Sequence, residues 1–149
     1  LQRGELTVTF DKSFRRVIQG CAALNSSRSG TWITRDMLNA YIRMHELGWA
    51  HSVEVWQGQE LVGGLYGMCI GRVFFGESMF SRVSNASKTA LVTLCNWLER
   101  QGIELIDCQV GNPHLYSMGA VDISRREFSA LLETLVNADP AINRRWALE

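Results

Sequence analysis

One helical pattern, which covers Ala86–Gln101, does most to limit what this chain can fold into. Its leucines recur at the spacing that places them on one face of a helix. Gly102 ends the helix, and the apolar segment Ile103–Val110 follows at once. Another strand pattern precedes the helix, so the sequence predicts a crossover between two parallel strands of one sheet, because tight turns join only antiparallel strands.

The segments before this helix predict an antiparallel meander. Strand patterns cover His51–Gln57, Glu60–Ile70 and Val73–Ser78, and the tight turn Gly58–Gln59 joins the first two. A further alternating strand is predicted at Leu6–Phe10. The element order therefore predicts an α/β fold, in which one mixed sheet has an antiparallel meander, a parallel crossover and helices on both faces.

Capping residues mark the other helices of the chain. Asp11, Thr34 and Ser124 each precede a helical pattern and are the predicted N-caps. The length of 149 residues suits one domain with a hydrophobic core, which we expect over residues 1–136. Residues 137–149 form a polar tail without a core pattern. The final Leu-Glu pair resembles a cloning scar, and the absence of an initial methionine suggests a piece of a longer protein.

Charge and cysteine usage exclude several classes of protein. Lys and Arg together number 15, as do Asp and Glu, so a general polyanion-coating protein is excluded, although a local phosphate-binding patch is not. The four cysteines have no C-x-x-C spacing, which argues against a zinc site and favours reduced thiols in a cytosolic protein. No apolar run reaches transmembrane length. We therefore expect no metal, no membrane segment and a cytoplasmic location.

The segment Ile103–Val110 carries two polar side chains where a buried strand should carry none. Side chains alternate along a strand, so Asp107 and Gln109 are expected to point the same way. Ile103 and Leu105 are expected to share that face, which starts apolar and turns polar. Ligands bind at the carboxyl ends of strands in open α/β sheets, and a buried carboxylate needs a partner or a function. This segment is therefore the predicted functional site.

Several motifs, placed in order along the chain, resemble the leucyl/phenylalanyl-tRNA–protein transferases. They are Gly-Gly-Leu-Tyr-Gly at 63–67, Phe-Gly-Glu-Ser-Met-Phe-Ser at 75–81, Asn-Ala-Ser-Lys at 85–88, Ile-Asp-Cys-Gln at 106–109, Ser-Met-Gly-Ala at 117–120, Gly-Thr-Trp-Ile-Thr at 30–34, Leu-Gly at 47–48 and His-Ser-Val-Glu at 51–54. The resemblance extends from about Leu6 to Val136. So many ordered motifs make it very specific.

The resemblance implies a fold, an activity and a set of partners. The fold is GNAT-like, and the family moves leucine, phenylalanine or methionine from tRNA onto proteins with an N-terminal lysine or arginine. The modified protein is then degraded through the bacterial N-degron route. Neither a metal nor a diffusible cofactor is implied, because the tRNA carries the activated acyl group. The chain departs from the family by lacking its smaller N-terminal domain and in the tail around Trp146.

The resemblance also implies that Asp107 and Gln109 act on the amine of the acceptor. A neutral amide accepts a hydrogen bond but is no useful base. An α-amino group has a pKa near 7.7–8.0, so roughly a tenth of it is already free amine at neutral pH. We therefore expect the Gln109 carbonyl oxygen to orient the amine, while Asp107 holds the Gln109 amide and offsets developing positive charge. The alternative is a buried structural hydrogen bond between the two.

A cationic N-terminal residue needs a carboxylate to receive it, and Glu77 is the candidate, either for that side chain or for the amine of the acceptor. The alternative is an internal ion pair between Glu77 and Arg72 or Arg82. The resemblance places the donor side-chain pocket at six apolar residues: Leu65, Phe74, Leu91, Leu94, Leu98 and Ile106. Plain core packing is the alternative for each of these six.

The 3′ end of the tRNA has three candidate contacts, Trp32, Ser78 and Asn112. Aromatic stacking on a terminal base is worth about 1–3 kcal/mol, but a tryptophan before a helix also packs well. The candidate acceptor-stem contacts, for each of which solvated surface charge is the alternative, are Arg125, Arg126, Arg144, Arg145, Lys12, Arg15 and Arg16. Two other functions stay open: an acyl-coenzyme A-dependent GNAT enzyme, which the missing pyrophosphate-binding loop counts against, and a non-catalytic module that binds N-terminal peptides or tRNA ends.

Overall fold

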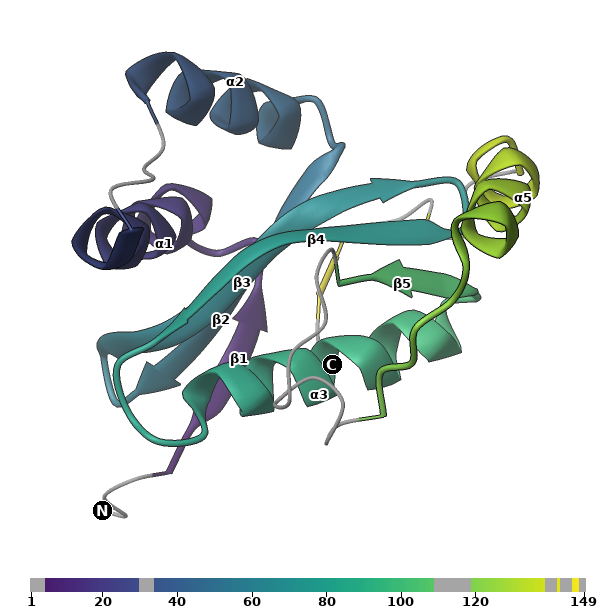
Figure 1. Ribbon diagram of the computed structural model, residues 1–149. Helices are drawn as coiled ribbons and strands as arrows, with labels where there is room; N and C mark the ends of the chain where they lie inside the picture. The colour runs from purple at the N-terminus through teal and green to yellow at the C-terminus, as the bar shows by residue number, and fades with distance from the viewer. Residues whose placement is uncertain (1–4, 30–33, 109–118, 139–141, 143–145, 148–149) are drawn as a thin grey trace.

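The computed structural model describes residues 5–29, 34–108, 119–138, 142 and 146–147. The described residues form a five-stranded sheet in the order β1-β2-β3-β4-β5 (Figure 1). Its strands are β1 (Thr7–Phe10), β2 (Ala50–Gln57), β3 (Glu60–Ile70), β4 (Val73–Ser81) and β5 (Leu105–Asp107). The helices are α1 (Phe14–Ser29), α2 (Arg35–Glu46), α3 (Ala86–Arg100) and α5 (Arg125–Val136). None of the helices in these segments is long and apolar enough to cross a membrane.

The predicted architecture is confirmed. The four strands β1 to β4 pair antiparallel in succession, and β5 pairs parallel to β4 after the α3 crossover. Thr34 and Ser124 cap α2 and α5 as predicted, since their hydroxyls accept hydrogen bonds from the amides of Met37 and Glu127 at 3.1 Å. The caps and the alternation of apolar residues thus fix these elements locally.

Helices pack against both faces of the sheet, with α3 on one face and α1 and α2 on the other (Figure 1), and an apolar cluster lies at each of these interfaces. The α3 cluster lies between α3 and one face, and its fully buried residues include Val55, Val62 and Leu94. The α1 cluster lies on the opposite face, under α1 and α2, and includes Val17 and Ile18. Helices therefore cover both faces, and β2 is buried on both, from Ala50 to Val55.

The predicted strand Ile103–Val110 is wrong in its extent. The strand β5 covers only Leu105–Asp107, and its residues are half-buried. The amides of Glu104 and Leu105 both donate to the Arg72 carbonyl oxygen, so the chain enters the sheet only at Leu105. Ile103 precedes the strand and lies in the α3 cluster with Ile106, so it does not share the face of Asp107.

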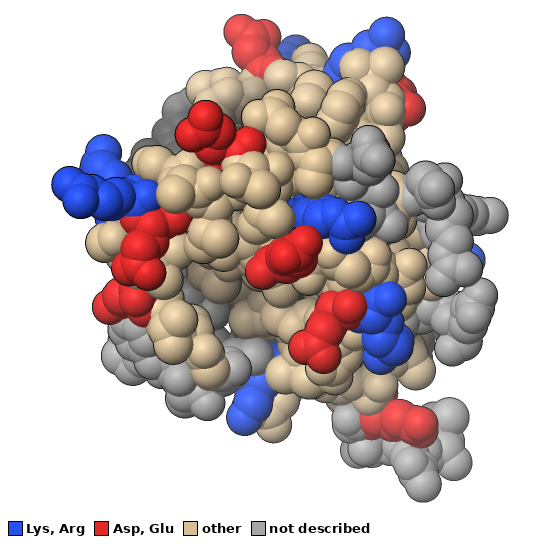
Figure 2. Space-filling model, turned by 90° about the vertical axis from the view of Figure 1, so that its right-hand side faces the viewer, with Lys and Arg blue, Asp and Glu red and all other residues tan. Residues whose placement is uncertain are grey.

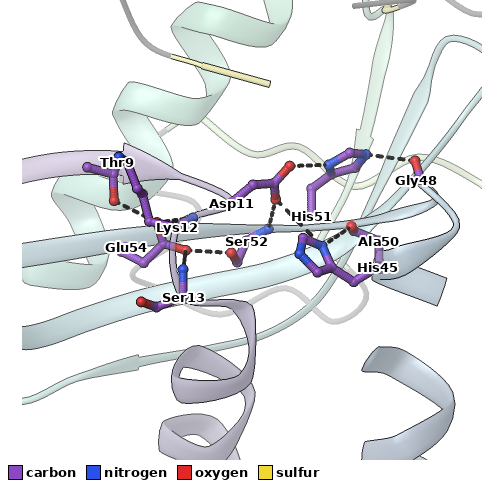
Figure 3. Close-up of polar contacts among 10 residues, drawn as sticks. All are labelled: Thr9, Asp11, Lys12, Ser13, His45, Gly48, Ala50, His51, Ser52 and Glu54. Atoms are coloured by element: carbon purple, nitrogen blue, oxygen red, sulfur yellow. Dashed lines mark hydrogen bonds and ion pairs between the residues drawn. The ribbon is translucent and has the colours of Figure 1, made fainter. Parts of the chain in front are cut away.

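A buried carboxylate joins β1, the start of α1 and β2 (Figure 3). The Glu54 side chain is fully buried and accepts hydrogen bonds from the Thr9 hydroxyl at 2.6 Å and from the Ser52 hydroxyl. It also accepts from the backbone amides of Lys12 at 3.1 Å and Ser13 at 3.3 Å. Four donors from two segments far apart in sequence therefore converge on one side chain.

Asp11 does not cap α1, contrary to the sequence prediction. Its carboxylate accepts from the Ser52 amide at 2.9 Å and lies 2.8 Å from Nδ1 of His51 (Figure 3). The backbone of Asp11 has a φ of +56°, which turns the chain toward β2. Glu54 receives the amides at the start of α1 instead, so this contact across 41 residues replaces the local cap.

Trp146 lies in the α3 cluster and is 5% exposed, although the sequence analysis finds no core pattern in the tail. Its ring stacks on His51 with centroids 3.9 Å apart and packs against Trp97 at 4.9 Å. A single aromatic residue leaves no periodicity in the sequence, so its burial has no signal there.

Candidate active site

Asp107 is the last residue of β5 and lies beside Phe75 of β4 in the parallel pair. Phe74 and Ile106, one position earlier on each strand, belong to the α3 cluster. Because successive side chains point to opposite faces, Phe75 and Asp107 point away from α3. Gln109, the predicted partner of Asp107, lies outside the described residues, so the pairing of the two stays a prediction.

A β-bulge in β4 sets the direction of Glu77. Tyr66 of β3 pairs with Ser78, whereas the next residue, Gly67, pairs with Gly76, so Glu77 is an extra residue in β4. The bulge brings two backbones close together, because a Cβ atom at Gly67 would lie 2.2 Å from a backbone oxygen of β4. Only glycine fits this position, which explains one glycine of the 63–67 motif.

The bulge places Glu77 and Ser78 on the same face of the sheet. The Tyr41 hydroxyl of α2 donates to Glu77 Oε1 at 3.0 Å, and Ser78 hydrogen-bonds Cys21 of α1. Both contacts lie on the side of α1 and α2, which is also the side toward which Asp107 points. Two carboxylates on adjacent strands therefore share one face of the sheet.

The arginines that the sequence offers as partners of Glu77 are engaged elsewhere. The Arg72 guanidinium lies 3.9 Å from the Glu104 carboxylate and donates to the Gly102 carbonyl oxygen. The Arg82 guanidinium lies over the Phe80 ring, 5.4 Å from its centroid. Across the described segments, no ion pair includes Glu77, and the Tyr41 hydroxyl donates a hydrogen bond to its carboxylate.

A cavity of about 970 Å³ lies between α3, the end of β5 and α5. Its walls combine apolar side chains with a few polar ones: Leu91, Val92, Cys95 and Asn96 of α3; residues 105–108; residues 119–123; and Arg125, Phe128, Ser129 and Leu132 of α5. Asp107 forms part of the wall at the carboxyl end of β5. The cavity thus offers an open, largely apolar hollow that extends to the carboxyl end of β5.

The six residues predicted for the donor side-chain pocket all belong to the α3 cluster. Leu91 and Ile106 line the cavity, whereas Leu65, Phe74, Leu94 and Leu98 are at most 3% exposed and pack behind them. Those four are core residues in this structure. A lining role for the whole set stays a prediction.

The cysteines at the cavity are neutral thiols. Burial, and to a smaller extent the neighbouring Cys108, raises the pKa of Cys95 to about 11. Burial and the nearby Asp107 also raise the pKa of Cys108 above its usual range. The thiolate is the nucleophilic form of cysteine, so these side chains act as small apolar groups at neutral pH rather than as nucleophiles.

We expect the native protein to resist thiol alkylation at pH 8. A free thiol has a pKa of about 8.5 and is roughly a quarter thiolate at that pH, whereas a pKa near 11 leaves about one part in a thousand. Reaction of Cys95 with iodoacetamide, followed by mass spectrometry of the peptides, should therefore be roughly two orders of magnitude slower than in guanidinium-unfolded protein. Rapid labelling of native Cys95 at pH 8 would contradict this assignment.

The structure describes only some of the residues that are predicted to contact the tRNA. Trp32 and Asn112 lie outside the described residues, and Ser78 lies beside Glu77 on the face toward α1. Arg125 and Arg126 are exposed at the start of α5. Figure 2 shows acidic and basic side chains interspersed on the face seen from the α5 side, so the described residues of that face form no continuous basic surface.

Sequence reasoning missed the polar role of Tyr41. The helical spacing places Tyr41 on the packing face of α2, and its ring does contact Tyr66 in the α1 cluster. Its hydroxyl also reaches Glu77, which is 36 residues away, and no local pattern signals that contact. Among the residues the structure describes, no three His, Cys, Asp or Glu side chains form a group that could hold a metal ion.

Comparison with known sequences identifies relatives along nearly the whole chain. The profile of the family described as leucyl/phenylalanyl-tRNA protein transferase matches residues 1–133. The leucyl/phenylalanyl-tRNA–protein transferase of Hahella chejuensis is 58% identical over 93% of this chain and 59% of the relative. That of Azoarcus sp. is 61% identical over 95% of this chain and 56% of the relative. The chain therefore spans less than two thirds of the length of these relatives.

Solved structures with little sequence similarity share the fold. An acetyltransferase of the GNAT family from Staphylococcus aureus Mu50 has a TM-score of 0.61 at 14% identity, over 83% of this chain and 88% of its own. A ribosomal-protein-alanine N-acetyltransferase from Brucella melitensis biovar Abortus has a TM-score of 0.58 at 12% identity, over 80% of this chain and 94% of its own. The predicted GNAT-like fold is thereby confirmed.

Proposed function

The chain belongs to the leucyl/phenylalanyl-tRNA–protein transferase family, and we propose that it is the part that carries the transfer reaction. The donor is leucine, phenylalanine or methionine esterified to tRNA, and the acceptor is a protein with an N-terminal lysine or arginine. The observation that supports this proposal most directly is the family match over residues 1–133. The reaction takes place in the bacterial cytoplasm and marks the acceptor for degradation through the N-degron route.

The geometry supports separate places for the two substrates. The cavity beside Leu91 and Ile106 suits the donor side chain, because it lies between α3 and α5 and apolar side chains such as Phe128 form much of its wall. Glu77 lies on the opposite face of the sheet and suits a cationic acceptor residue, because a tyrosine and not an arginine holds it. Asp107 borders the cavity from β5 and points toward the face of Glu77, so the two substrates meet beside it.

The reaction is the attack of the acceptor α-amine on the carbonyl carbon of the aminoacyl ester. A nitrogen–carbon bond forms, and the bond from that carbon to the ribose oxygen breaks. The proton that leaves the amine ends on the ribose oxygen. In this proposal Gln109 orients the amine through its carbonyl oxygen, and Asp107 offsets the positive charge that develops on nitrogen.

Positioning supplies most of the acceleration in this proposal. The ester is already activated, and holding two reactants in line contributes up to about 7–11 kcal/mol in favourable cases. Neither a metal nor a diffusible cofactor is therefore required. Because the cavity thiols are neutral and therefore poor nucleophiles, the proposal includes no covalent enzyme intermediate through cysteine. Trp32, Ser78 and Asn112 are proposed to hold the 3′ end of the tRNA.

The test is leucine transfer from charged tRNA to a peptide that begins with arginine, with this chain as the enzyme. We expect a product that carries one added leucine, detected by mass spectrometry. The control peptide has the same sequence with an acetylated N-terminus and should not react. If acetyl-coenzyme A supported acylation of the peptide and charged tRNA did not, the chain would be an acyl-coenzyme A enzyme instead. Tight peptide binding without any transfer would make it a binding module.

The Glu77→Gln variant tests the acceptor site. Loss of the negative charge removes a charge-assisted contact, which is worth about 1.5–3 kcal/mol, so we expect the KM for an arginine-starting peptide to rise about tenfold or more. The KM for charged tRNA should stay within about twofold. Glu60→Gln is the matched control, because Glu60 is an exposed carboxylate at the start of β3. An unchanged acceptor KM in Glu77→Gln would exclude this role.

A further inference from the structure

The hydrogen bond that holds the Glu77 side chain comes from a helix and not from the sheet. As the extra residue of the bulge it has no cross-strand partner opposite it in β3. The Tyr41 hydroxyl of α2 donates to its Oε1 at 3.0 Å. The Tyr41 ring is itself fixed, since it packs edge-on against Tyr66 with centroids 5.3 Å apart, and Tyr66 is 3% exposed.

We infer that Tyr41 is a positioning residue, whose hydroxyl fixes the orientation of the Glu77 carboxylate so that it receives an arginine side chain in a two-point contact. The inference deepens the proposed function and rests on the acceptor role of Glu77. Tyr41 does not need to touch the acceptor. It acts by restricting the rotation of a carboxylate that the bulge has left without a neighbour in the ladder.

The protonation state of Tyr41 and the two oxygens of the Glu77 carboxylate support this positioning role. Burial, and then the charge of Glu77, raises the pKa of Tyr41 to about 12, so the hydroxyl stays protonated and donates at neutral pH. A carboxylate has two oxygens with about four lone-pair sites in total. One bond from Tyr41 to Oε1 therefore leaves room for two parallel N–H donors, one at each oxygen.

Arginine and lysine respond differently to such a carboxylate. The guanidinium is a planar fork whose two-point contact depends on the orientation of the carboxylate, whereas the lysine ammonium is a point charge. Loss of the Tyr41 hydroxyl should therefore weaken the binding of an arginine acceptor more than the binding of a lysine acceptor. A general loosening of α2 would weaken the binding of both acceptors equally. A difference between the two therefore distinguishes a positioning role from a structural one.

The experiment compares Tyr41→Phe with the wild-type chain. The phenyl ring keeps the packing on Tyr66, so the melting temperature should change little. Calorimetry then measures the Kd of two peptides that differ only in an N-terminal arginine or lysine. We expect the arginine peptide to bind about five- to tenfold more weakly in the variant, and the lysine peptide to change by at most about twofold.

A double-mutant cycle is the matched control. In a Glu77→Gln background, Tyr41→Phe should have no further effect on arginine-peptide binding, because the carboxylate that it positions is gone. The inference would be overturned if Tyr41→Phe weakened arginine-peptide binding equally in the wild-type and Glu77→Gln backgrounds. It would also be overturned if Tyr41→Phe weakened the binding of arginine and lysine peptides equally.

Failure of the inference and failure of the acceptor role of Glu77 give different results. If Glu77→Gln weakens binding and Tyr41→Phe does not, the positioning role alone is wrong. If Glu77→Gln leaves binding unchanged, the acceptor role is wrong and the inference fails with it. The transfer assay with charged tRNA reports on the proposed reaction independently of these binding measurements.

Discussion

Replacement of Asp107 by alanine should lower the rate of leucine transfer to an arginine-starting peptide by about a hundredfold. Asp107 ends β5, borders the apolar cavity and points toward the face that carries Glu77. In the proposed reaction this carboxylate stabilises positive charge only while the amine attacks, so its loss should act on kcat. A hundredfold decrease corresponds to about 2.7 kcal/mol of transition-state stabilisation. The KM values for tRNA and peptide should stay within about threefold.

Two comparisons sharpen the Asp107 prediction. Glu99→Ala is the matched control, because Glu99 is an exposed carboxylate of α3 outside the cavity wall, so its removal should leave kcat nearly unchanged. Gln109→Ala should resemble Asp107→Ala, and the double variant should be little worse than either, since groups that act as a unit are not additive. A transfer rate in Asp107→Ala within threefold of wild type would refute the proposed role.

Replacement of Glu54 by alanine should lower the free energy of unfolding by about 3–5 kcal/mol. Glu54 is fully buried, and its removal leaves the hydroxyls of Thr9 and Ser52 and the amides of Lys12 and Ser13 without their acceptor. Each buried donor without a partner costs about 1–3 kcal/mol, although the contributions are not additive. For a domain of this size the melting temperature should fall by roughly 10 °C. Urea unfolding followed by circular dichroism measures the difference.

Control variants separate this network from a general loss of charge. Glu60→Ala removes an exposed carboxylate in the next strand and should change stability by no more than about 0.5 kcal/mol. Ser52→Ala removes one of the four donors and should cost about 1 kcal/mol. If Glu54→Ala lost less than about 1 kcal/mol, the network would contribute little to the fold.

The sequence predicts the elements of this protein well because their signals are local. Thr34 and Ser124 cap helices by accepting hydrogen bonds from amides only three residues away. A glycine after a helix likewise affects only the turn in which it lies. The helix between two strand patterns predicts the parallel pair of β4 and β5. Asp11 shows where local reasoning fails, because Glu54 supplies the contact that a cap would have made.

The candidate site was predictable as a set of residue types, but not as a geometry. The spacing and the family resemblance single out Asp107 and Glu77. The face on which Glu77 lies depends on the bulge, and the bulge depends on how β3 and β4 pair. The same holds for the six donor-pocket candidates, since periodicity indicates an apolar face but not which residues reach the cavity.

The sequence by itself therefore determined the order of the elements, the fold class and the family of this chain. Only the tertiary structure decided that Tyr41 supports Glu77, that Glu54 is buried among four donors and that Trp146 stacks on His51. The physical reason is sequence separation. Caps, turns and periodicity act over one to four residues. These three contacts instead join segments that lie between 36 and 95 positions apart in the sequence, so only the packed chain brings them together.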